Sequence, residues 1–334
     1  MPIKRILIAW FEYTINGGIS RFINLAKCLQ DHGIDIQFLS LSGQLKTSWP
    51  SFPSPILSLE EASAERWDVI MLPGAGAEPA KLAQLSQLQH ERFGLRVQHI
   101  LNDPHFYERF EQANLAFRPQ VIIFNNNHWR ISDYRNLNAQ HFFNVVGGID
   151  QSRFCPPPKK AFRKNGIVRV AGLASNNFRP LLEAFDVLPA NFELHAFGRC
   201  PDNLTHLWNK LILTGRAKDY GYLFDQDLLN FYHNVDLVVA TDIHAGWCNL
   251  AAEAMACGLP CILTRAGTLD FADHLVNSFL IESVNSAEIV EAILRLTEDE
   301  QLRTTLSANA PRALSPFNLI NYAKLLIETL QSAM

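Results

Sequence analysis

The sequence lacks the cysteine spacings that mark zinc sites and disulfide-rich secreted domains. Its 334 residues include six cysteines, and no two of them form a CxxC pair. Reduced thiols in a cytosol fit this pattern. The chain also lacks any apolar run near the ~18 residues that a membrane-spanning helix needs, and its first apolar segment is too short for the core of a secretory signal. We therefore expect a soluble, cytoplasmic protein that holds no zinc.

A surplus of positive charge is absent as well. The chain carries 29 Lys and Arg against 33 Asp and Glu, which gives a formal net charge of −4. Nucleic acid is not an expected partner, because binding its phosphates needs a surplus of cations on one face. The halves differ mildly: residues 1–160 carry 16 cations against 14 carboxylates, and residues 161–334 carry 13 against 19. Peripheral contact of the first half with an anionic membrane surface stays open.

Strand-like apolar runs alternate with amphipathic helical stretches along the whole chain. This alternation is typical of parallel βαβ units. Among the strands it predicts are residues 220–223 and 237–240. Because 334 residues exceed one ordinary hydrophobic core, we predict an α/β protein with two Rossmann-like, doubly wound parallel sheets. Three consecutive prolines at 156–158 predict a stiff linker. The predicted domains are residues 1–155 and 161–315, and a helix over 316–334 is expected to pack back on the first domain.

A glycine pair follows the first predicted strand, which covers residues 6–10. Gly17 and Gly18 lie in the loop before a predicted helix, for which Ser20 is the expected N-cap. Glycines let a backbone come close to a ligand, and the N-terminus of the following helix favours an anion. A purely structural tight turn explains the same residues equally well, so both interpretations stay open.

The most informative segment runs from His244 to Pro260. A buried strand leads into a loop, then into a short helix, then through Gly-Leu-Pro into the next strand. The helix is expected to begin near Cys248, Asn249 and Leu250 and to present backbone amides to a diphosphate. Glu253 lies one turn further along, where its two oxygens can accept hydrogen bonds from a vicinal diol such as a ribose. A solvent-facing glutamate without such a role is the alternative.

This segment resembles the carboxy-terminal signature of the family 4 retaining glycosyltransferases of GT-B fold, E-G-F-G-L-P-x-x-E-A-M-A-C-G-x-P. The resemblance extends to the first strand with its glycine pair, to residues 146–156, and to the strand that contains Gly172. It covers nearly the whole chain and implies two domains that face a cleft, with the last helix crossing back to the first domain. The residues that match the signature in register are Gly246, Glu253, Ala254, Met255, Ala256, Cys257, Gly258 and Pro260.

The resemblance implies an enzyme that needs no metal and no cofactor. Such an enzyme transfers a hexosyl or related group, with retention, from a nucleotide sugar to a hydroxyl of a glycan or lipid-linked acceptor. The first domain is implied to bind the acceptor and the second the donor, in the synthesis of cell-surface polysaccharide or lipopolysaccharide. Two alternatives stay open: a catalytically weak GT-B protein that serves as a binding partner, and a sugar-nucleotide epimerase.

The resemblance also assigns contacts with the donor. Glu253 is implied to hold the ribose, and backbone groups near Tyr222 are implied to meet the base. Gly17 and Gly18 are implied to lie against the diphosphate, and Gly172 belongs to the same set of donor-binding residues.

Two departures from the family pattern affect this assignment. The family has a second Glu, which contacts the transferred sugar, where this chain has Ala245, and we expect His244 to substitute for it in part. The family's Arg and Lys, which neutralise the diphosphate, are replaced by Leu173 and Phe178. Arg179 is the predicted remaining cation, because a guanidinium suits phosphate geometry. An exposed Arg179 without a role is the alternative.

Polar residues also follow two predicted strands of the first domain. The segment from His99 to His105 resembles the family's loop with a histidine that faces the donor sugar. We predict His105 as that catalytic residue and expect His99 to pack within the strand. The cluster Asn125-Asn126-Asn127-His128 lies at the same predicted sheet edge, where it either contacts the acceptor or caps a helix.

A DxD spacing occurs at Asp225 and Asp227. This spacing binds a metal and a diphosphate in another glycosyltransferase fold. Here it opens a predicted helix, and carboxylates in a first turn complement the helix dipole. We therefore expect no metal at this site.

Overall fold

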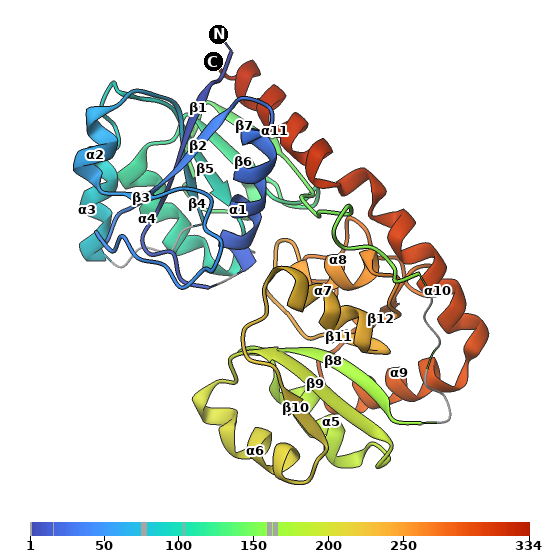
Figure 1. Ribbon diagram of the computed structural model, residues 1–334. Coiled ribbons are helices and arrows are strands. Elements are labelled where there is room, and N and C mark those ends of the chain that lie inside the picture. The colour runs from blue at the N-terminus through green and yellow to red at the C-terminus, as the bar shows by residue number, and fades with distance from the viewer. Residues whose placement is uncertain (1, 16, 75–78, 103, 159–161, 163–165) are drawn as a thin grey trace. The chain divides into compact units, whose positions relative to one another are not determined.

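The chain folds into two compact units, each built on its own parallel sheet (Figure 1). This computed structural model describes residues 2–15, 17–74, 79–102, 104–158, 162 and 166–334. Unit 1 comprises Met1–Gly148 and Phe317–Met334, and unit 2 comprises Ile149–Pro316.

The sheet of unit 1 has the strand order β3-β2-β1-β4-β5-β6-β7, and its pairs are parallel. The order runs outward in both directions from the neighbours β1 and β4, as in a doubly wound fold. The strands are β1 (Arg5–Trp10), β2 (Asp35–Ser40), β3 (Ile56–Leu57), β4 (Trp67–Pro73), β5 (Phe93–Ile100), β6 (Val121–Phe124) and β7 (His141–Asn144).

Helices cover both faces of this sheet (Figure 1). Side chains alternate along β1, so Ile6 and Ile8 point to one face while Leu7 and Ala9 point to the other. The first face packs against α1 and α11 in one hydrophobic core, and the second packs against α2, α3 and α4 in another. The helices are α1 (Gly17–Gln30), α2 (Leu59–Ala64), α3 (Pro79–Gln87), α4 (Tyr107–Phe117) and α11 (Leu319–Ser332), with 3-10 turns η1 (Pro104–Phe106) and η2 (Ile131–Asp133).

The final helix, α11, packs against elements from the beginning of the chain. Its Tyr322 is buried, and the Tyr322 hydroxyl lies 3.3 Å from Nε2 of His99 in β5. Leu326 and Leu330 pack in the same core as Phe22 of α1. The last eighteen residues therefore belong to unit 1.

Unit 2 has a six-stranded parallel sheet of order β10-β9-β8-β11-β12-β13. One face packs against α5, α6 and α9. On the other face, the ring of Phe197 in β9 meets the rings of Phe231 and Tyr232 in α7. The strands are β8 (Val168–Ala174), β9 (Phe192–Gly198), β10 (Ala217–Asp219), β11 (Leu237–Ala240), β12 (Cys261–Leu263) and β13 (Phe279–Leu280). The helices are α5 (Arg179–Val187), α6 (Thr205–Leu213), α7 (Asp225–Asn234), α8 (Asn249–Ala256), α9 (Ser286–Glu298) and α10 (Glu300–Ala313), with 3-10 turns η3 (Asp202–Leu204) and η4 (Ser315–Phe317).

The division between the units falls earlier than the predicted proline linker. Residues 149–155 pack in unit 2, because Gln151 Nε2 donates a 3.0 Å hydrogen bond to Pro311 O and Arg153 Nη1 lies 3.2 Å from Asp225 Oδ1. The prolines at 156–158 therefore follow a segment that is already held by α7 and α10 of unit 2.

Two local predictions are wrong. The helix α1 begins at Gly17, so Ser20 lies inside its first turn and is not the N-cap. The strand expected at 220–223 lies at Ala217–Asp219 instead. It ends there because Gly221 has a φ of +58°, which a strand cannot contain, and because the Gly221 amide donates a 2.8 Å hydrogen bond to Asp219 Oδ1.

Candidate functional site

The loops that follow β11 and β12 are tied together at the carboxyl edge of the sheet in unit 2. Thr264 Oγ1 donates a hydrogen bond to the backbone oxygen of Asp242, and the Cys248 amide donates to Gly267 O over 2.9 Å. Gly267 has a φ of +69°, and a Cβ there would lie 2.7 Å from Cys248 N. Ligands of doubly wound sheets bind at this edge, so these contacts shape the loop at the place where a ligand is expected.

The helix α8 begins directly after this loop. Cys248 is its N-cap, so a thiol and not an oxygen faces the first turn and the Ala251 amide. A thiol is a weak acceptor, so the first turn lacks the oxygen cap that Ser, Thr, Asn or Asp would supply. The positive end of the helix dipole therefore suits an anion. The Cys248 amide is already bonded to Gly267 O, contrary to the prediction that it meets a diphosphate, and such contacts of Asn249 and Leu250 stay predictions.

A carboxylate lies beside this helix start. Asp242 Oδ2 is 3.6 Å from Cys248 Sγ. Burial raises the pKa of the Asp242 carboxyl, and burial together with the Asp242 charge raises the pKa of the Cys248 thiol well above its ordinary value. The sequence analysis did not identify Asp242, although it is the first ionisable residue after a buried strand at the ligand-binding edge.

Glu253 lies one turn into α8 and is half-buried. Its Oε2 accepts a 2.7 Å hydrogen bond from the hydroxyl of Tyr232 in α7, and Tyr232 itself is fully buried. Burial raises the pKa of Glu253 to about 7, while the bond from Tyr232 and the charge of Arg153 act in the opposite direction. No hydrogen bond from the described residues reaches Oε1, so this oxygen can accept a ligand hydroxyl.

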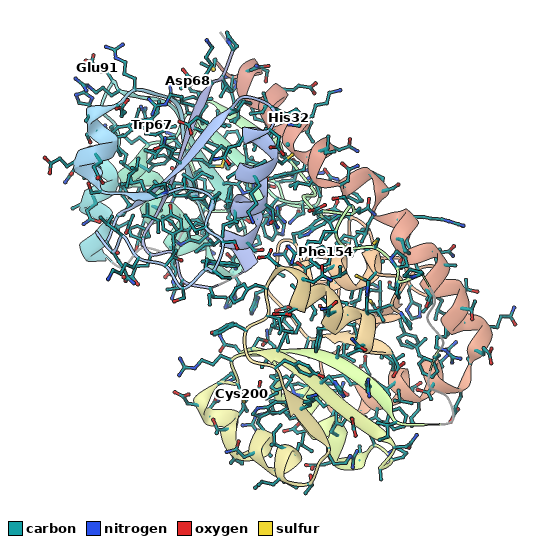
Figure 2. All side chains as sticks on the ribbon, viewed as in Figure 1. His32, Trp67, Asp68, Glu91, Phe154 and Cys200 are labelled. Carbon is teal, nitrogen blue, oxygen red and sulfur yellow. The ribbon has the colours of Figure 1, made fainter. Side chains whose placement is uncertain are left out.

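Arg153 joins the surroundings of Glu253 to the start of α7. Its Nη2 donates a 2.7 Å hydrogen bond to Asp225 O, and its guanidinium lies 4.7 Å from the centroid of the Phe154 ring. Phe154, which Figure 2 labels, packs edge-on against Tyr232 with 6.0 Å between ring centroids. These contacts join Arg153, Phe154 and Tyr232 into one cluster around Glu253 of α8.

Asp225 and Asp227 lie in the first turn of α7, as predicted. Asp225 has a φ of 44° and is held by both of its contacts with Arg153. In the part of the chain that the structure describes, no three His, Cys, Asp or Glu side chains are grouped so that they could hold a metal ion.

Three further residues from the sequence prediction line the same edge of unit 2. Gly246 is buried and His244 is half-buried in the loop before α8. Tyr222 is 48% exposed in the loop after β10. This loop is joined to the end of β9, because the Gly198 amide donates a 2.7 Å hydrogen bond to Gly221 O. Their predicted contacts with a donor stay predictions.

Gly172 and Arg179 lie at β8 and α5. Gly172 is buried inside β8, where a Cβ would collide with the side chain of Leu181, so this glycine lets α5 pack closely on the sheet. Arg179 is the first residue of α5, and its side chain is 48% exposed with Nη1 3.5 Å from Glu183 Oε1. A role for either residue in donor binding stays a prediction.

In unit 1, Gly17 and Gly18 form the start of α1 after β1. Asn16 and Asp103, which belong to the two predicted loops, lie outside the described residues. His105 is exposed in η1, after β5. His99 is buried within β5 as predicted, and burial lowers its pKa to about 3.

Asparagine side chains after β6 bond to the backbone of their own loop and of the loop after β5. Asn126 Oδ1 accepts hydrogen bonds from the amides of His128 and Trp129 at 2.9 and 2.8 Å, and Asn125 Nδ2 donates to Leu101 O at 3.2 Å. Asn125 and Asn126 are buried. These two side chains therefore bond to loop backbone, and residues 128 and 129 are not part of a helix, so the predicted helix cap is wrong. Contact with an acceptor stays a prediction.

Sequence reasoning placed Glu253 and the start of α8 correctly within one element, but it missed Tyr232 and Arg153. The apolar face of α7, with Leu228, Phe231 and Tyr232 buried, is a signal for burial of the tyrosine. No local pattern links it to a glutamate 21 residues later.

Residues 164–299 match the family of glycosyl transferases group 1. This match extends from the approach to β8 as far as α9, and it contains the whole of α7 and α8. Glu253, Tyr232 and the loop that carries Asp242 and Cys248 therefore lie inside the matched segment.

Curated relatives match shorter stretches. D-inositol 3-phosphate glycosyltransferase of Saccharomonospora viridis is 28% identical over 110 residues, which are 33% of this chain and 26% of that protein. The capsular polysaccharide biosynthesis glycosyltransferase CapM of Staphylococcus aureus is 32% identical over 84 residues, which are 25% of this chain and 22% of that protein. The matched stretches thus span about a quarter of the length of these relatives.

The similarity of fold extends over the whole chain. The crystal structure of Anabaena HepE in complex with UDP and glucose matches with a TM-score of 0.75 at 19% identity, and the match covers 99% of this chain and 100% of that one. The two parallel-sheet α/β units are those of the GT-B fold, which confirms the predicted fold class.

Proposed function

We propose that this protein is a glycosyltransferase that binds a nucleotide sugar at α8 of unit 2 and transfers the sugar to an acceptor hydroxyl. One observation carries the proposal. Glu253, whose Oε2 accepts a hydrogen bond from Tyr232, lies one turn beyond a helix start that has no oxygen cap, inside the segment that matches glycosyl transferases group 1. A diphosphate and a neighbouring diol are the groups that such a pair of features recognises.

The diphosphate is assigned to the first turn of α8. Amides there point out of the helix start, and the dipole favours negative charge. An α-helix rises 1.5 Å per residue, so Glu253 lies about 6 Å along the axis from Asn249. That spacing lets the ribose next to the diphosphate reach Glu253 Oε1 with its hydroxyls.

The donor is proposed to be a nucleoside diphosphate hexose or a related sugar. UDP is the first nucleotide to test, because the structurally similar HepE was crystallised with UDP and glucose. Tyr222, exposed in the loop after β10, is proposed to lie near the base. His244 and Gly246 are proposed to lie along the sugar and diphosphate.

The reaction breaks the bond between the anomeric carbon and the diphosphate and forms a bond from the acceptor oxygen to that carbon. The proton of the acceptor hydroxyl passes to the leaving nucleoside diphosphate. We propose that it proceeds with retention and without metal or cofactor, since the amides of α8 can stabilise the leaving diphosphate. Arg179 is proposed to add a cation, because its exposed pair with Glu183 is weak and can be exchanged for phosphate. His105 is proposed to act at the donor sugar.

The proposed setting is the synthesis of cell-surface polysaccharide or lipopolysaccharide in the cytoplasm, with a glycan or lipid-linked acceptor bound by unit 1. The partial match to a capsular polysaccharide glycosyltransferase supports this setting. Among the helices of the described residues, none has the length and apolarity required to span a membrane. Peripheral contact of the first half with an anionic membrane is proposed as the route to a lipid-linked acceptor, because residues 1–160 carry 16 cations against 14 carboxylates.

A partner-binding protein with little activity is the second candidate. Ala245 and Leu173 favour it, because they remove a carboxylate and a cation that the resemblance would place on the sugar and the diphosphate. Both candidates predict nucleotide binding, so turnover must separate them.

A panel of nucleotide sugars tests the proposal. A ligand present at 100 times its dissociation constant should stabilise the folded protein by about 2.7 kcal/mol, which a thermal-shift screen detects. Binding together with donor hydrolysis or transfer supports the enzyme. Binding without either supports the second candidate, interconversion of free nucleotide sugars indicates an epimerase, and the absence of binding to any member of the panel rejects the assignment of α8.

A further inference from the structure

We propose that Tyr232 is a positioning residue of the donor site, whose hydroxyl holds Glu253 in the orientation and the ionised form that a ribose diol requires. The inference rests on the proposed function, because it assigns the second oxygen of Glu253 to a bound nucleotide. It adds to that function a residue that touches no substrate atom and yet sets the affinity.

The position of the Tyr232 hydroxyl is fixed by packing. The side chain is 0% exposed, and its ring meets those of Phe154, Phe197 and Phe231 edge-on at centroid distances of 6.0, 6.3 and 5.8 Å. A ring enclosed in this way has one position for its hydroxyl. Because a carboxylate is planar, the 2.7 Å bond to Oε2 of Glu253 also limits where Oε1 can point.

The donors of a diol and the acceptor positions of Glu253 explain why nucleotide binding needs the ionised carboxylate. A diol brings two O–H donors, and a carboxylate offers about four acceptor positions, of which Tyr232 uses one. A protonated carboxyl keeps at most three of these positions, and hydrogen bonds to them are weaker because the acceptor has lost its charge. Nucleotide binding is therefore coupled to the loss of the Glu253 proton.

The groups around the pair divide into those that favour the proton and those that oppose it. Burial favours the neutral acid and raises the pKa of Glu253 to about 7, while the Tyr232 bond and the charge of Arg153 favour the carboxylate. Cys248 and Cys257 at the two ends of α8 are the other ionisable groups that act on Tyr232. Arg153 is shared with Asp225, at an Nη1–Oδ1 distance of 3.2 Å. Tyr232 is therefore the direct partner that favours the ionised form.

The first test needs no ligand. The folded-state pKa of Glu253 lies above its ordinary value of 4.5, so the stabilisation from its proton is present below about pH 4.5 and is lost as pH rises through about 7. Urea unfolding gives the free energy of unfolding of the wild type and of Glu253→Gln at each pH from 4.5 to 9. The difference between the two free energies, plotted against pH, shows this loss. In Tyr232→Phe the pKa of Glu253 should be higher still, so the same loss should be centred at higher pH than in the wild type.

The second test measures the affinity for UDP-glucose by calorimetry between pH 6 and 8.5. UDP-glucose is the chosen probe because both of its phosphates are diesters, which do not titrate in this range. Wild-type affinity should rise as pH increases through about 7. Tyr232→Phe should bind about tenfold more weakly at pH 7, with its rise moved to higher pH, and should have no further effect in a Glu253→Gln background.

Tyr13→Phe is the matched control, because the buried Tyr13 hydroxyl, 2.6 Å from Ile8 O, lies in unit 1. It should lower stability and leave the pH profile of affinity unchanged. An unchanged profile in Tyr232→Phe, or an equal loss of affinity with and without Glu253, would overturn the positioning role. If the stability curves shift as expected while wild-type protein binds no nucleotide sugar, the proposed function fails and the positioning of a diol fails with it.

Discussion

The amide of Cys248 donates a 2.9 Å hydrogen bond to the carbonyl oxygen of Gly267, and the two residues approach so closely that no side chain fits at Gly267. The contact joins the start of α8 to the loop after β12. It therefore fixes the helix start to which we assign the diphosphate, at a position where the backbone needs glycine for two reasons: a positive φ and a neighbouring amide.

Gly267→Ala should disrupt this contact. The added Cβ would lie 2.7 Å from Cys248 N at a φ of +69°, and we expect a loss of about 2–4 kcal/mol of stability from the strain and the displaced backbone. Nucleotide affinity should fall more than tenfold where the variant remains folded. Chemical unfolding and calorimetry measure the two effects.

Gly215→Ala is the control for this substitution. Gly215 has nearly the same φ, +70°, but nothing lies within 4 Å of a Cβ placed there. Gly215→Ala should lose only the stability that a positive φ costs an L-residue, about 1 kcal/mol. It should bind nucleotide as the wild type does. Equal losses of stability and affinity in the two variants would contradict a specific role for the Gly267–Cys248 contact.

Asp242→Asn should strengthen the binding of UDP. The Asp242 carboxylate contacts Cys248, the N-cap of α8, and removing a like charge near a diphosphate is worth on the order of 1 kcal/mol, or roughly fivefold in affinity. Because burial raises the pKa of Asp242, the stabilisation from its proton is lost as pH rises through the folded-state pKa. The variant should therefore be more stable than the wild type at pH 8, with a smaller difference at pH 4.

Asp186→Asn serves as its control, since this carboxylate pairs with Lys210 at 2.7 Å near the end of α5. It should leave UDP affinity unchanged. A fall in affinity in Asp242→Asn would indicate instead that the carboxylate contacts the ligand directly.

His105→Ala should lower turnover by at least about tenfold, as expected for a residue that acts on the reacting sugar, and should change donor affinity less than twofold. His32→Ala, which alters another exposed histidine of unit 1 (Figure 2), is the matched control and should keep full activity. Steady-state kinetics with a donor found in the panel distinguishes the two. Full activity in His105→Ala would reject the catalytic role.

Much of the fold could be predicted because buried parallel strands appear as short apolar runs. Residues 237–240 were predicted as a strand and form β11. The short edge strand β10, Ala217–Asp219, has no such run and is half-buried to exposed, so only its turn residues mark its end. The helix start at Gly17 was missed because glycine is a poor helix former and is typical of a turn.

The candidate site was predictable where it is local in sequence. The start of α8 and Glu253 lie within six residues and follow a recognisable pattern. The pair of Tyr232 and Glu253 joins two helices, and the contact of Arg153 with Asp225 joins residues 72 apart. Such contacts depend on how α7 packs over the sheet, which no spacing in the sequence reveals.

The central claim is that Glu253 holds the ribose of a nucleotide, and calorimetry of UDP binding to Glu253→Ala tests it most directly. The variant should bind about 1.5–3 kcal/mol more weakly than the wild type, or roughly 10- to 150-fold, because a charge-assisted pair of hydrogen bonds is lost. Glu291→Ala, at an exposed position of α9, should bind as the wild type does. Unchanged affinity in Glu253→Ala, with the wild type binding UDP, would contradict the account.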